Sequence, residues 1–468
     1  MPDDRLLLIS YHFPPAQTAG ALRWEKLARY AAERGYGLDV VTLDPAQVPR
    51  PDHRRVAALP AGTTITGVRE EPVWSDRLER GLWKLLRGTG GQPGAWTGQP
   101  SANHGDGSSA NGPPSTVNGA RPVSLAPEEI RWSLAPRAVM RLWWTLNFWH
   151  RDAAWARAAA AAGRRLLTRA HRAVITCGPP HQAHRAGARL ARESGLPFIM
   201  DLRDPWSLPR RLPEHLASPL NFTLAGWAER RCVDRASLVA CNTEPLRDAM
   251  RRRYPAAQER IIAVMNGYDD EPLPAANHRS NTFTVTYAGA LYLDRDPRLF
   301  LRAAGRVARD LALAPEEFEI VFLGSGPTFG NTPITALAEE EGVGGFVRVL
   351  PRLPRADALA FLARSTMLLN LPQDSPYAVP SKVFEYLMFE NWVLALAAPG
   401  TPTATALRGT GVDVLAPNDV DGIARLLRAR IEAFRRGERP GPIAGRERLS
   451  RTHQARILFD AIDRVVGR

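Results

Sequence analysis

Short apolar runs that alternate with amphipathic stretches are the feature that most constrains how this chain folds. The run at residues 6–10 is followed by a Pro/Gly loop, then by apolar side chains at helical spacing from Trp24 to Ala31, and then by a second run at residues 38–43. Gly35 supplies a helix stop between them. Strand, loop, helix and strand in this order begin a parallel, doubly wound α/β sheet, whose ligands bind at the carboxyl ends of the strands.

The same alternation continues in two series, which predicts two domains. The first series holds predicted strands at 173–177, 197–202 and 237–241 and a helix at 182–194. The second holds predicted strands at 283–288, 318–324, 347–350, 367–372 and 392–397 and a helix at 298–313. Since 468 residues exceed the usual size of one core, we expect an N-terminal domain over 1–275, a C-terminal domain over 276–440, and a last helix within 441–468.

One segment, between about residues 88 and 125, breaks the pattern. It consists almost entirely of Gly, Pro, Ser, Asn, Thr and Gln, with hardly any apolar residue. A segment of this composition cannot bury enough apolar surface to fold. We therefore predict a disordered insertion in the N-terminal domain.

Positive charge exceeds negative charge, since 61 Lys and Arg oppose 48 Asp and Glu and leave a formal charge of +13. This favours anionic partners: phosphorylated substrates, an anionic membrane surface or nucleic acid. No helix-turn-helix, zinc or RNA-binding motif is recognised, so we expect no nucleic-acid partner. Three cysteines show no metal-ligand spacing, and we recognise no leader or membrane-spanning run. We expect a cytoplasmic protein without a metal cofactor.

The first candidate site is the loop that ends at Gly20, where a strand leads into a helix. Backbone N–H groups at a helix N-terminus attract phosphate, and a glycine allows the anion to come close, so we assign Gly20 to donor binding. A tight turn without a ligand is the alternative. The spacing departs from GxGxxG, so we predict no dinucleotide site here.

Two further candidates follow predicted strands of the C-terminal domain. Arg295 stands beside the start of a helix, where a cation suits a diphosphate that leaves with its negative charge stabilised. Lys382 is one of three lysines in the chain and lies in the first turn of a helix that begins at Ser381. Glu385 lies on the same face, so the two side chains suit a phosphate and a ribose; a surface ion pair is the alternative.

Charged residues follow the predicted strand that ends at Leu202, at the edge where such sheets bind ligands. They are Asp201, Arg203 and Asp204, with Trp206 beside them. A carboxylate there, for which we select Asp204, is placed to receive the proton of an acceptor. An internal Arg–Asp ion pair that shapes the loop is the alternative.

Arginines and aromatic residues mix between residues 136 and 172. They are Arg137, Arg141, Trp143, Trp144, Phe148, Trp149, Arg151, Arg157, Arg164, Arg165, Arg169 and Arg172. These residue types suit a lipid headgroup interface and a lipid-linked acceptor. Burial of half of the aromatic residues in the core is the alternative.

In their order along the chain, these motifs resemble family 4 of the retaining, nucleotide-sugar-dependent glycosyltransferases. The resemblance extends over nearly the whole chain apart from the insertion. It rests on Phe13-Pro-Pro with Gly20, Gly178-Pro-Pro-His, Asp201-Leu-Arg-Asp-Pro-Trp, Asn266-Gly-Tyr-Asp, Tyr287-Ala-Gly-Ala-Leu, Leu323-Gly-Ser-Gly-Pro and Pro380-Ser-Lys-Val-Phe-Glu-Tyr.

The resemblance implies a GT-B fold, in which two Rossmann-like domains face each other across a cleft. The C-terminal domain then binds the donor nucleotide, the N-terminal domain binds the acceptor, and the last helix crosses back to the N-terminal domain. It implies that Gly289 and Arg295 bind the donor diphosphate and that Glu385 binds the ribose, as the second glutamate of the family's E-x7-E pattern. Two positions depart from the family: Tyr377 stands at the first position of that pattern, and Ala290 stands where many members carry an arginine.

The resemblance also places His181 at a helix start that faces the cleft, as a catalytic residue; a helix cap is the alternative. The leading hypothesis is a retaining glycosyltransferase of polysaccharide or glycoconjugate biosynthesis, cytoplasmic or peripheral at the inner face of the membrane. Its substrates are a nucleotide-sugar donor and a glycan, lipid-linked or small-molecule acceptor. The alternatives are a nucleotide-sugar epimerase on the same fold and a basic binding protein whose site no longer turns over.

Overall fold

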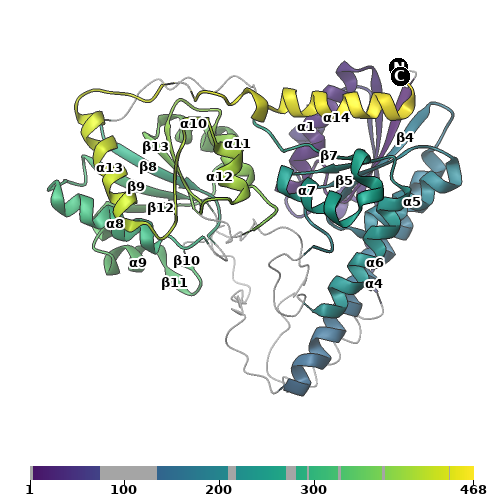
Figure 1. Ribbon diagram of the computed structural model, residues 1–468, viewed down its shortest axis with the longest axis horizontal. Helices are drawn as coiled ribbons and strands as arrows, with labels where there is room; N and C mark the ends of the chain where they lie inside the picture. The colour runs from purple at the N-terminus through teal and green to yellow at the C-terminus, as the bar shows by residue number, and fades with distance from the viewer. Residues whose placement is uncertain are drawn as a thin grey trace, which may run out of the picture. The chain divides into compact units, whose positions relative to one another are not determined.

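The computed structural model describes residues 4–73, 134–208, 218–269, 281–291, 295–324, 328–371, 375–441 and 443–468. They form two compact units, each built on its own parallel sheet (Figure 1). The described residues up to Val264, together with Ala455–Arg468, belong to the first unit, and those of Met265–Gln454 to the second. The predicted insertion at 88–125 lies outside the described residues.

The first unit contains a parallel sheet of seven strands in the order β3-β2-β1-β4-β5-β6-β7. The strands are β1 Asp4–Ser10, β2 Tyr36–Leu43, β3 Thr63–Val68, β4 His171–Gly178, β5 Phe198–Leu202, β6 Leu238–Cys241 and β7 Ile261–Ala263. The order reverses between β1 and β4, so the carboxyl ends of these two strands flank the switch point at which doubly wound sheets bind ligands. Central strands such as β1 are almost wholly buried, as expected when helices cover both faces of a sheet.

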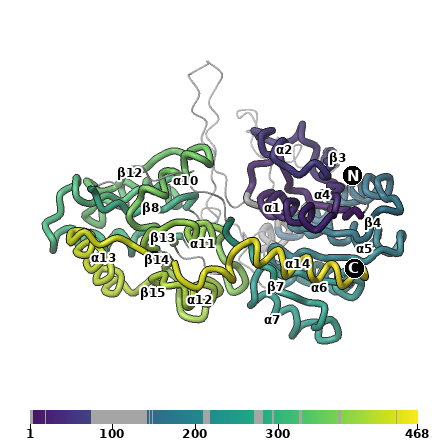
Figure 2. The backbone as a smooth tube through the Cα atoms, turned by 90° about the horizontal axis from the view of Figure 1, so that it is seen from above, coloured from purple at the N-terminus to yellow at the C-terminus, as the bar shows by residue number. Residues whose placement is uncertain are grey.

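Helices of the first unit are α1 Ala19–Glu33, α2 His53–Ala57, α4 Leu134–Leu166, α5 Gln182–Ser194, α6 Pro219–Arg235 and α7 Glu244–Arg253, joined by most of α14 Arg451–Val466. Figure 2 shows α14 running along this unit. Its side chains Leu458, Phe459 and Ile462 are buried in the same apolar cluster as Trp24 of α1. Arg34, which ends α1, forms ion pairs with Asp460 and Asp463 of α14.

The second unit contains a parallel sheet of six strands in the order β12-β9-β8-β13-β14-β15. The strands are β8 Phe283–Ala288, β9 Phe318–Leu323, β12 Val347–Leu350, β13 Met367–Asn370, β14 Trp392–Leu396 and β15 Asp413–Leu415, with a small hairpin of β10 Thr328–Phe329 and β11 Thr332–Pro333. The helices are α8 Arg298–Asp310, α9 Ile334–Glu340, α10 Arg355–Arg364, α11 Ser381–Tyr386, α12 Pro402–Leu407 and α13 Val420–Arg435. Here the order reverses between β8 and β13, which flank the switch point.

The division of the chain differs from the expected boundaries near 275 and 440. Residues just after Val264 pair with residues just before Ala455: the Tyr268 N–H donates to the Leu449 carbonyl at 3.0 Å, and Arg451 Nε donates to Asp269 Oδ1 at 2.5 Å. Both segments therefore belong to the second unit. The predicted fold class is confirmed, since each unit is a doubly wound parallel α/β sheet.

Candidate functional site

The switch point of the second sheet brings together the loop after β8 and the helix α11. The strands β8 and β13 are neighbours, with Met367 opposite Val285. The backbone N–H of Ala288 donates to the hydroxyl of Tyr386 at 3.0 Å, and this tyrosine is fully buried. Helix α11 is thus fastened directly to the end of β8, and its first turn lies beside Gly289.

Gly289 leaves the space that the Lys382 side chain occupies. Its φ of +127° lies in the region that favours glycine, and a Cβ at this position would overlap the Lys382 ammonium. Behind it, a Cβ on Gly324 would come within 2.7 Å of the Gly289 carbonyl oxygen. The two loop glycines let the backbones pack closely, so that a cation stands at the carboxyl end of β8.

The ammonium of Lys382 lies in an unfavourable electrostatic environment. Burial and the nearby Arg295 lower its pKa to about 7, while Glu385 acts in the opposite direction. Its Nζ lies 5.0 Å from the ring centroid of Tyr287, and among the described residues no carboxylate forms an ion pair with it. A bound anion would therefore stabilise this site.

Arg295 is directed back toward the same loop. Its Nη1 donates to the carbonyl of Ala290 at 3.4 Å, and the hydroxyl of Tyr287 donates to that carbonyl at 2.8 Å. The structure thus brings together Gly289, Arg295 and Lys382, three of the residues that the sequence analysis assigned to the donor diphosphate. The first-turn residue Ser381 is exposed at the start of α11.

Glu385 lies one turn after Lys382 but is held by another helix. Its Oε1 accepts a hydrogen bond from Arg355 Nη1 of α10 at 2.6 Å, and its side chain is 25% exposed. Tyr377, at the position where the family has its first glutamate, is partly buried in the loop before α11. The sequence analysis did not identify Arg355, which lies 30 residues away and carries no local signal.

In the first unit, Gly20 contacts Arg203. A Cβ on Gly20 would overlap the Arg203 guanidinium, so a cation covers the start of α1. Asp204 Oδ2 lies 3.6 Å from Arg203 Nε, and the Asn242 side chain donates to the Arg203 carbonyl at 3.0 Å. The structure thus brings Gly20, Arg203 and Asp204 together near the carboxyl end of β5.

Asp201, by contrast, points into the core. It accepts three hydrogen bonds from Arg23, two from Nε at 2.8 Å and 3.2 Å and one from Nη2 at 2.8 Å. A fourth comes from Trp24 Nε1 at 2.8 Å. Arg23 is 2% exposed and Asp201 fully buried. This pair fixes α1 to the sheet, so the alternative of an internal Arg–Asp pair is correct, with Arg23 rather than Arg203 as the partner.

His181 is buried against two other rings. It stacks on Trp206 with a centroid distance of 5.4 Å and lies 5.7 Å from the ring of His184. His184 Nδ1 is 2.7 Å from the hydroxyl of Thr176, and burial lowers the pKa of His184 to about 3. A Cβ on Gly178 would lie 2.9 Å from His181 Nδ1 and 2.6 Å from His184 Nε2, so the ring pair packs tightly on the end of β4. Sequence reasoning missed His184, although it lies one helical turn after His181.

His12, at the end of β1, is a further residue that the sequence analysis missed. It is 6% exposed, and burial together with the positive charge of Arg203 lowers its pKa to about 3. It is therefore neutral at physiological pH. Beside it the chain carries Tyr11, whose ring meets that of His12 edge-on at 5.0 Å.

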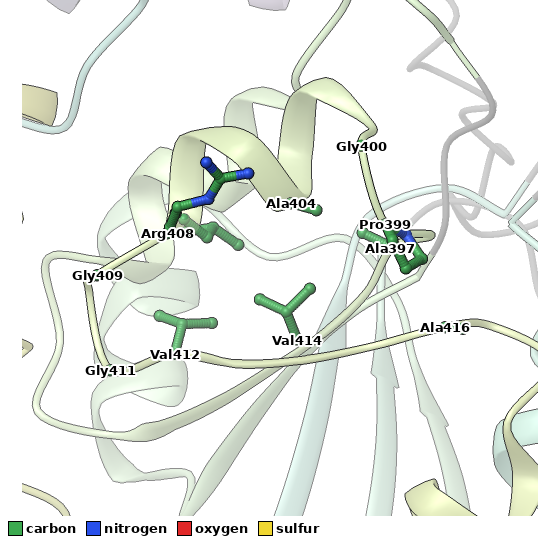
Figure 3. Close-up of a pocket in the computed structure, with 11 residues that line it drawn as sticks. Ala397, Pro399, Gly400, Ala404, Arg408, Gly409, Gly411, Val412, Val414 and Ala416 are labelled. Atoms are coloured by element: carbon green, nitrogen blue, oxygen red, sulfur yellow. The ribbon is translucent and has the colours of Figure 1, made fainter.

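A pocket of about 360 Å³ lies in the second unit beside α12 (Figure 3). Its lining comes from the ends of β14 and β15 and from α12, and it is apolar apart from Arg408. None of the predicted site residues lines it. No helix in the described part of the chain is long and apolar enough to cross a bilayer.

No family model matches the sequence. Over 274 residues the chain is 29% identical to the D-inositol 3-phosphate glycosyltransferase of Corynebacterium glutamicum (strain R). That match covers 51% of this chain and 62% of the relative, which is less than two thirds of the relative's length.

Solved structures match the whole chain at low identity. A glycosyltransferase of Rickettsia africae has a TM-score of 0.59 at 10% identity, covering 99% of this chain and 98% of its own. Sucrose-phosphate synthase of Thermosynechococcus elongatus has a TM-score of 0.59 at 12% identity, covering 99% of both chains. HepE of Anabaena, solved with UDP and glucose, has a TM-score of 0.57 at 14% identity, covering 98% of this chain and 100% of its own. The chain therefore has the GT-B fold of glycosyltransferases, and over half of its length it is similar to one of them in sequence.

Proposed function

We propose that this chain is a retaining glycosyltransferase that transfers a sugar from a nucleotide-sugar donor to a glycan, lipid-linked or small-molecule acceptor. The observation that carries the proposal is the Lys382 ammonium beside Gly289. It is a half-buried cation with a pKa lowered to about 7, beside Arg295, at the switch point of a doubly wound sheet. The similarity to a glycosyltransferase and the shared fold support the same function.

In this proposal, Lys382 and Arg295 bind the diphosphate of the donor. When the bond between the sugar and the diphosphate breaks, the leaving group gains negative charge, and two fixed cations stabilise that charge most in the transition state. Arg295 Nη1 already contacts the carbonyl of Ala290. The guanidinium thus stands beside the position where the related family often carries an arginine, which supports its assignment as the second cation.

Glu385 binds the ribose in this proposal. A carboxylate accepts several hydrogen bonds, so the one from Arg355 leaves acceptor capacity for a ribose hydroxyl. The ion pair also holds the carboxylate in place. Donor recognition thus involves a pair of side chains from α10 and α11.

The first unit supplies the acceptor side of the proposed reaction. Asp204 is a partly exposed carboxylate at the carboxyl edge of the sheet, and we assign it to receive the proton when the acceptor hydroxyl bonds to the sugar. His181, held by Trp206, is the second catalytic candidate. Gly20 and Arg203 offer a further contact for an anion, at the start of α1. We name no nucleophile.

Thermal-shift and calorimetric titrations with the diphosphates of uridine, guanosine, adenosine and thymidine, and with their sugars, test the donor site. We expect the diphosphate and the nucleotide sugars of one of the four nucleosides to stabilise the protein. Lys382→Ala should weaken the binding of that diphosphate by one to two orders of magnitude. Lys26→Ala, in α1 of the first unit, is the matched control. Failure of all four series to bind, or equal binding by Lys382→Ala, would overturn the donor site.

Turnover assays then separate the alternatives. A transferase consumes donor in step with acceptor, whereas an epimerase isomerises donor when no acceptor is present. A binding protein whose site no longer turns over binds the diphosphate and leaves the donor intact. Analysis of the anomeric configuration of the product tests retention.

A further inference from the structure

Large apolar side chains that are strongly exposed lie, within the described residues, on two helices of the first unit. Leu142 and Leu146 of α4 are 48% and 52% exposed. Leu220 and Trp227 of α6 are 40% and 50% exposed. Leucine and tryptophan side chains elsewhere in the described chain are better covered, so these four are the most exposed large apolar side chains among the described residues.

Hydrogen bonds hold the two helices together at this region. The hydroxyls of Thr145 and Ser218 are 2.9 Å apart, and Trp149 Nε1 donates to Asn221 Oδ1 at 2.8 Å. Figure 1 shows α4 and α6 side by side, extending beyond the strands of the first unit. We call the exposed residues Leu142, Leu146, Leu220 and Trp227, with the arginines around them, the α4–α6 surface.

The region shares α4 with the interface expected at 136–172, but its exposed apolar residues are not the aromatic residues of that stretch. Trp149 of that stretch is used for the contact between the helices and is only partly exposed. Trp227, which lies outside the stretch, is the aromatic residue that is strongly exposed. Trp149 is thus half-buried in the contact with α6 rather than buried in the core.

Arginines lie beside the exposed tryptophan. The guanidinium of Arg231 lies 3.7 Å from the ring centroid of Trp227, and Arg253 Nη2 lies 3.0 Å from where a Cβ on Gly226 would stand. Arg230 is exposed, while its neighbour Glu229 is turned inward and accepts from Ser207 and Tyr254. Asp234 is the exposed acid of α6, against the exposed Arg230, Arg231 and Arg235 of the same helix. The exposed side of α6 therefore carries a net positive charge.

We propose that the α4–α6 surface binds peripherally to an anionic phospholipid bilayer. Leucine side chains that protrude singly, and a tryptophan with a polar N–H, match the boundary between acyl chains and headgroups. Arginines that extend along an apolar surface keep their guanidinium groups at the level of the phosphates. The apolar residues and the positive charge together fit an anionic bilayer better than a neutral one. This inference does not depend on the proposed donor site.

Co-sedimentation of the full chain with vesicles tests the proposal. The probes are vesicles of phosphatidylcholine with one third phosphatidylglycerol, and vesicles of phosphatidylcholine alone. We expect binding to the anionic vesicles that falls steeply as ionic strength rises from about 0.1 M to about 1 M, because the Debye length shortens from about 10 Å to about 3 Å. Binding to neutral vesicles should be at least about tenfold weaker.

Variants separate the contribution of the apolar side chains to vesicle binding from that of the positive charges. Trp227→Ala should weaken vesicle binding about fivefold to tenfold. The exposed half of the tryptophan side chain would no longer be transferred from water into the bilayer. Arg230→Glu with Arg231→Glu should weaken it by more than tenfold, at about fivefold for each arginine lost. Arg425→Glu, at an exposed position of α13 in the second unit, is the matched control and should bind like the parent. Circular dichroism and thermal unfolding check that each variant is folded.

Three outcomes would overturn the proposal. The first is no sedimentation of the folded parent with anionic vesicles, and the second is equal sedimentation with both vesicle types. The third is unchanged binding by both the Trp227 and the arginine variants. A parent that is dimeric by light scattering, and that becomes monomeric as Trp227→Ala, would assign the surface to a second copy of the chain instead. Donor binding, measured in parallel, is expected to be unchanged in every variant, so failure here is distinguishable from failure of the donor site.

Discussion

Donor affinity should depend on pH through Lys382, and this dependence is the sharpest consequence of the structure. The free protein holds Lys382 with a pKa of about 7, because burial and Arg295 disfavour its charged form. A bound diphosphate would favour that form and raise the pKa. Above pH 7 binding must therefore take up a proton, while below pH 7 Lys382 is already charged.

The size of the change in the dissociation constant follows from this coupling between proton uptake and binding. A charge-assisted bond from the ammonium to a phosphate is worth about 1.5–3 kcal/mol, so complete loss of the charge weakens binding by one to two orders of magnitude. Between about pH 7 and pH 9 the dissociation constant should rise, at a limiting slope of tenfold per pH unit, and then level off once this contribution is lost. Below pH 7 it should be flat.

Isothermal titration with the nucleotide sugar that binds best is the assay. A sugar nucleotide is preferable to the free diphosphate, because a terminal phosphate itself ionises with a pKa near about 6. Lys382→Arg is the control, since its guanidinium stays charged over the whole range and should remove the slope. Two results would refute the reasoning: a flat dissociation constant in the parent from pH 7 to pH 9, or the same slope in the Lys382→Arg variant.

Other predictions concern residues of the proposed donor site in the second unit and the buried ion pair of the first unit. Gly289→Ala should abolish diphosphate binding in calorimetry and lower the free energy of unfolding by about 2 kcal/mol, because the added methyl overlaps Lys382 in a conformation that disfavours side chains; parent-like binding would contradict this. Glu385→Gln should weaken the binding of the free nucleoside as well as that of its diphosphate, whereas Lys382→Ala should weaken only the binding of the diphosphate. The opposite pattern would exchange the roles of the two residues. Asp201→Asn should lower the free energy of unfolding in urea by about 3 kcal/mol, because Arg23 would keep a buried charge without a carboxylate partner; a change below about 0.5 kcal/mol would show that the pair is dispensable.

Elements with strong local patterns were predicted well from the sequence. Helix α5, Gln182–Ser194, and strand β8, Phe283–Ala288, occupy the predicted residues. Strand β15, Asp413–Leu415, and strand β7, Ile261–Ala263, were missed, because three residues carry too little periodicity to be recognised. The last helix, expected within 441–468, begins at Arg451 after a short 3-10 turn.

At the donor site, Gly289 was added by the family resemblance. Arg295 and Lys382 were selected as candidates because each follows a strand of a doubly wound sheet, and connections in such sheets carry ligand-binding residues to one edge. That edge is a property of topology, which the order of strands and helices along the chain already indicates. The direction in which each carboxylate side chain points cannot be inferred from that order. The sequence places Asp201 and Asp204 at the same edge, and only the structure shows that Asp201 is fully buried while Asp204, the selected residue, is partly exposed.

By itself, then, the sequence determined the class of fold and the edge of each sheet at which chemistry is expected, because hydrophobic periodicity and loop composition depend on near neighbours. Only the tertiary structure decided the partners: Arg355 for Glu385 across 30 residues, and Arg23 for Asp201 across 178 residues. It also decided that Trp227 is exposed while Trp149 contacts α6. A side chain's partner and its burial depend on which distant segments pack around it, and this is set by the packing of helices on the sheet rather than by adjacent residues.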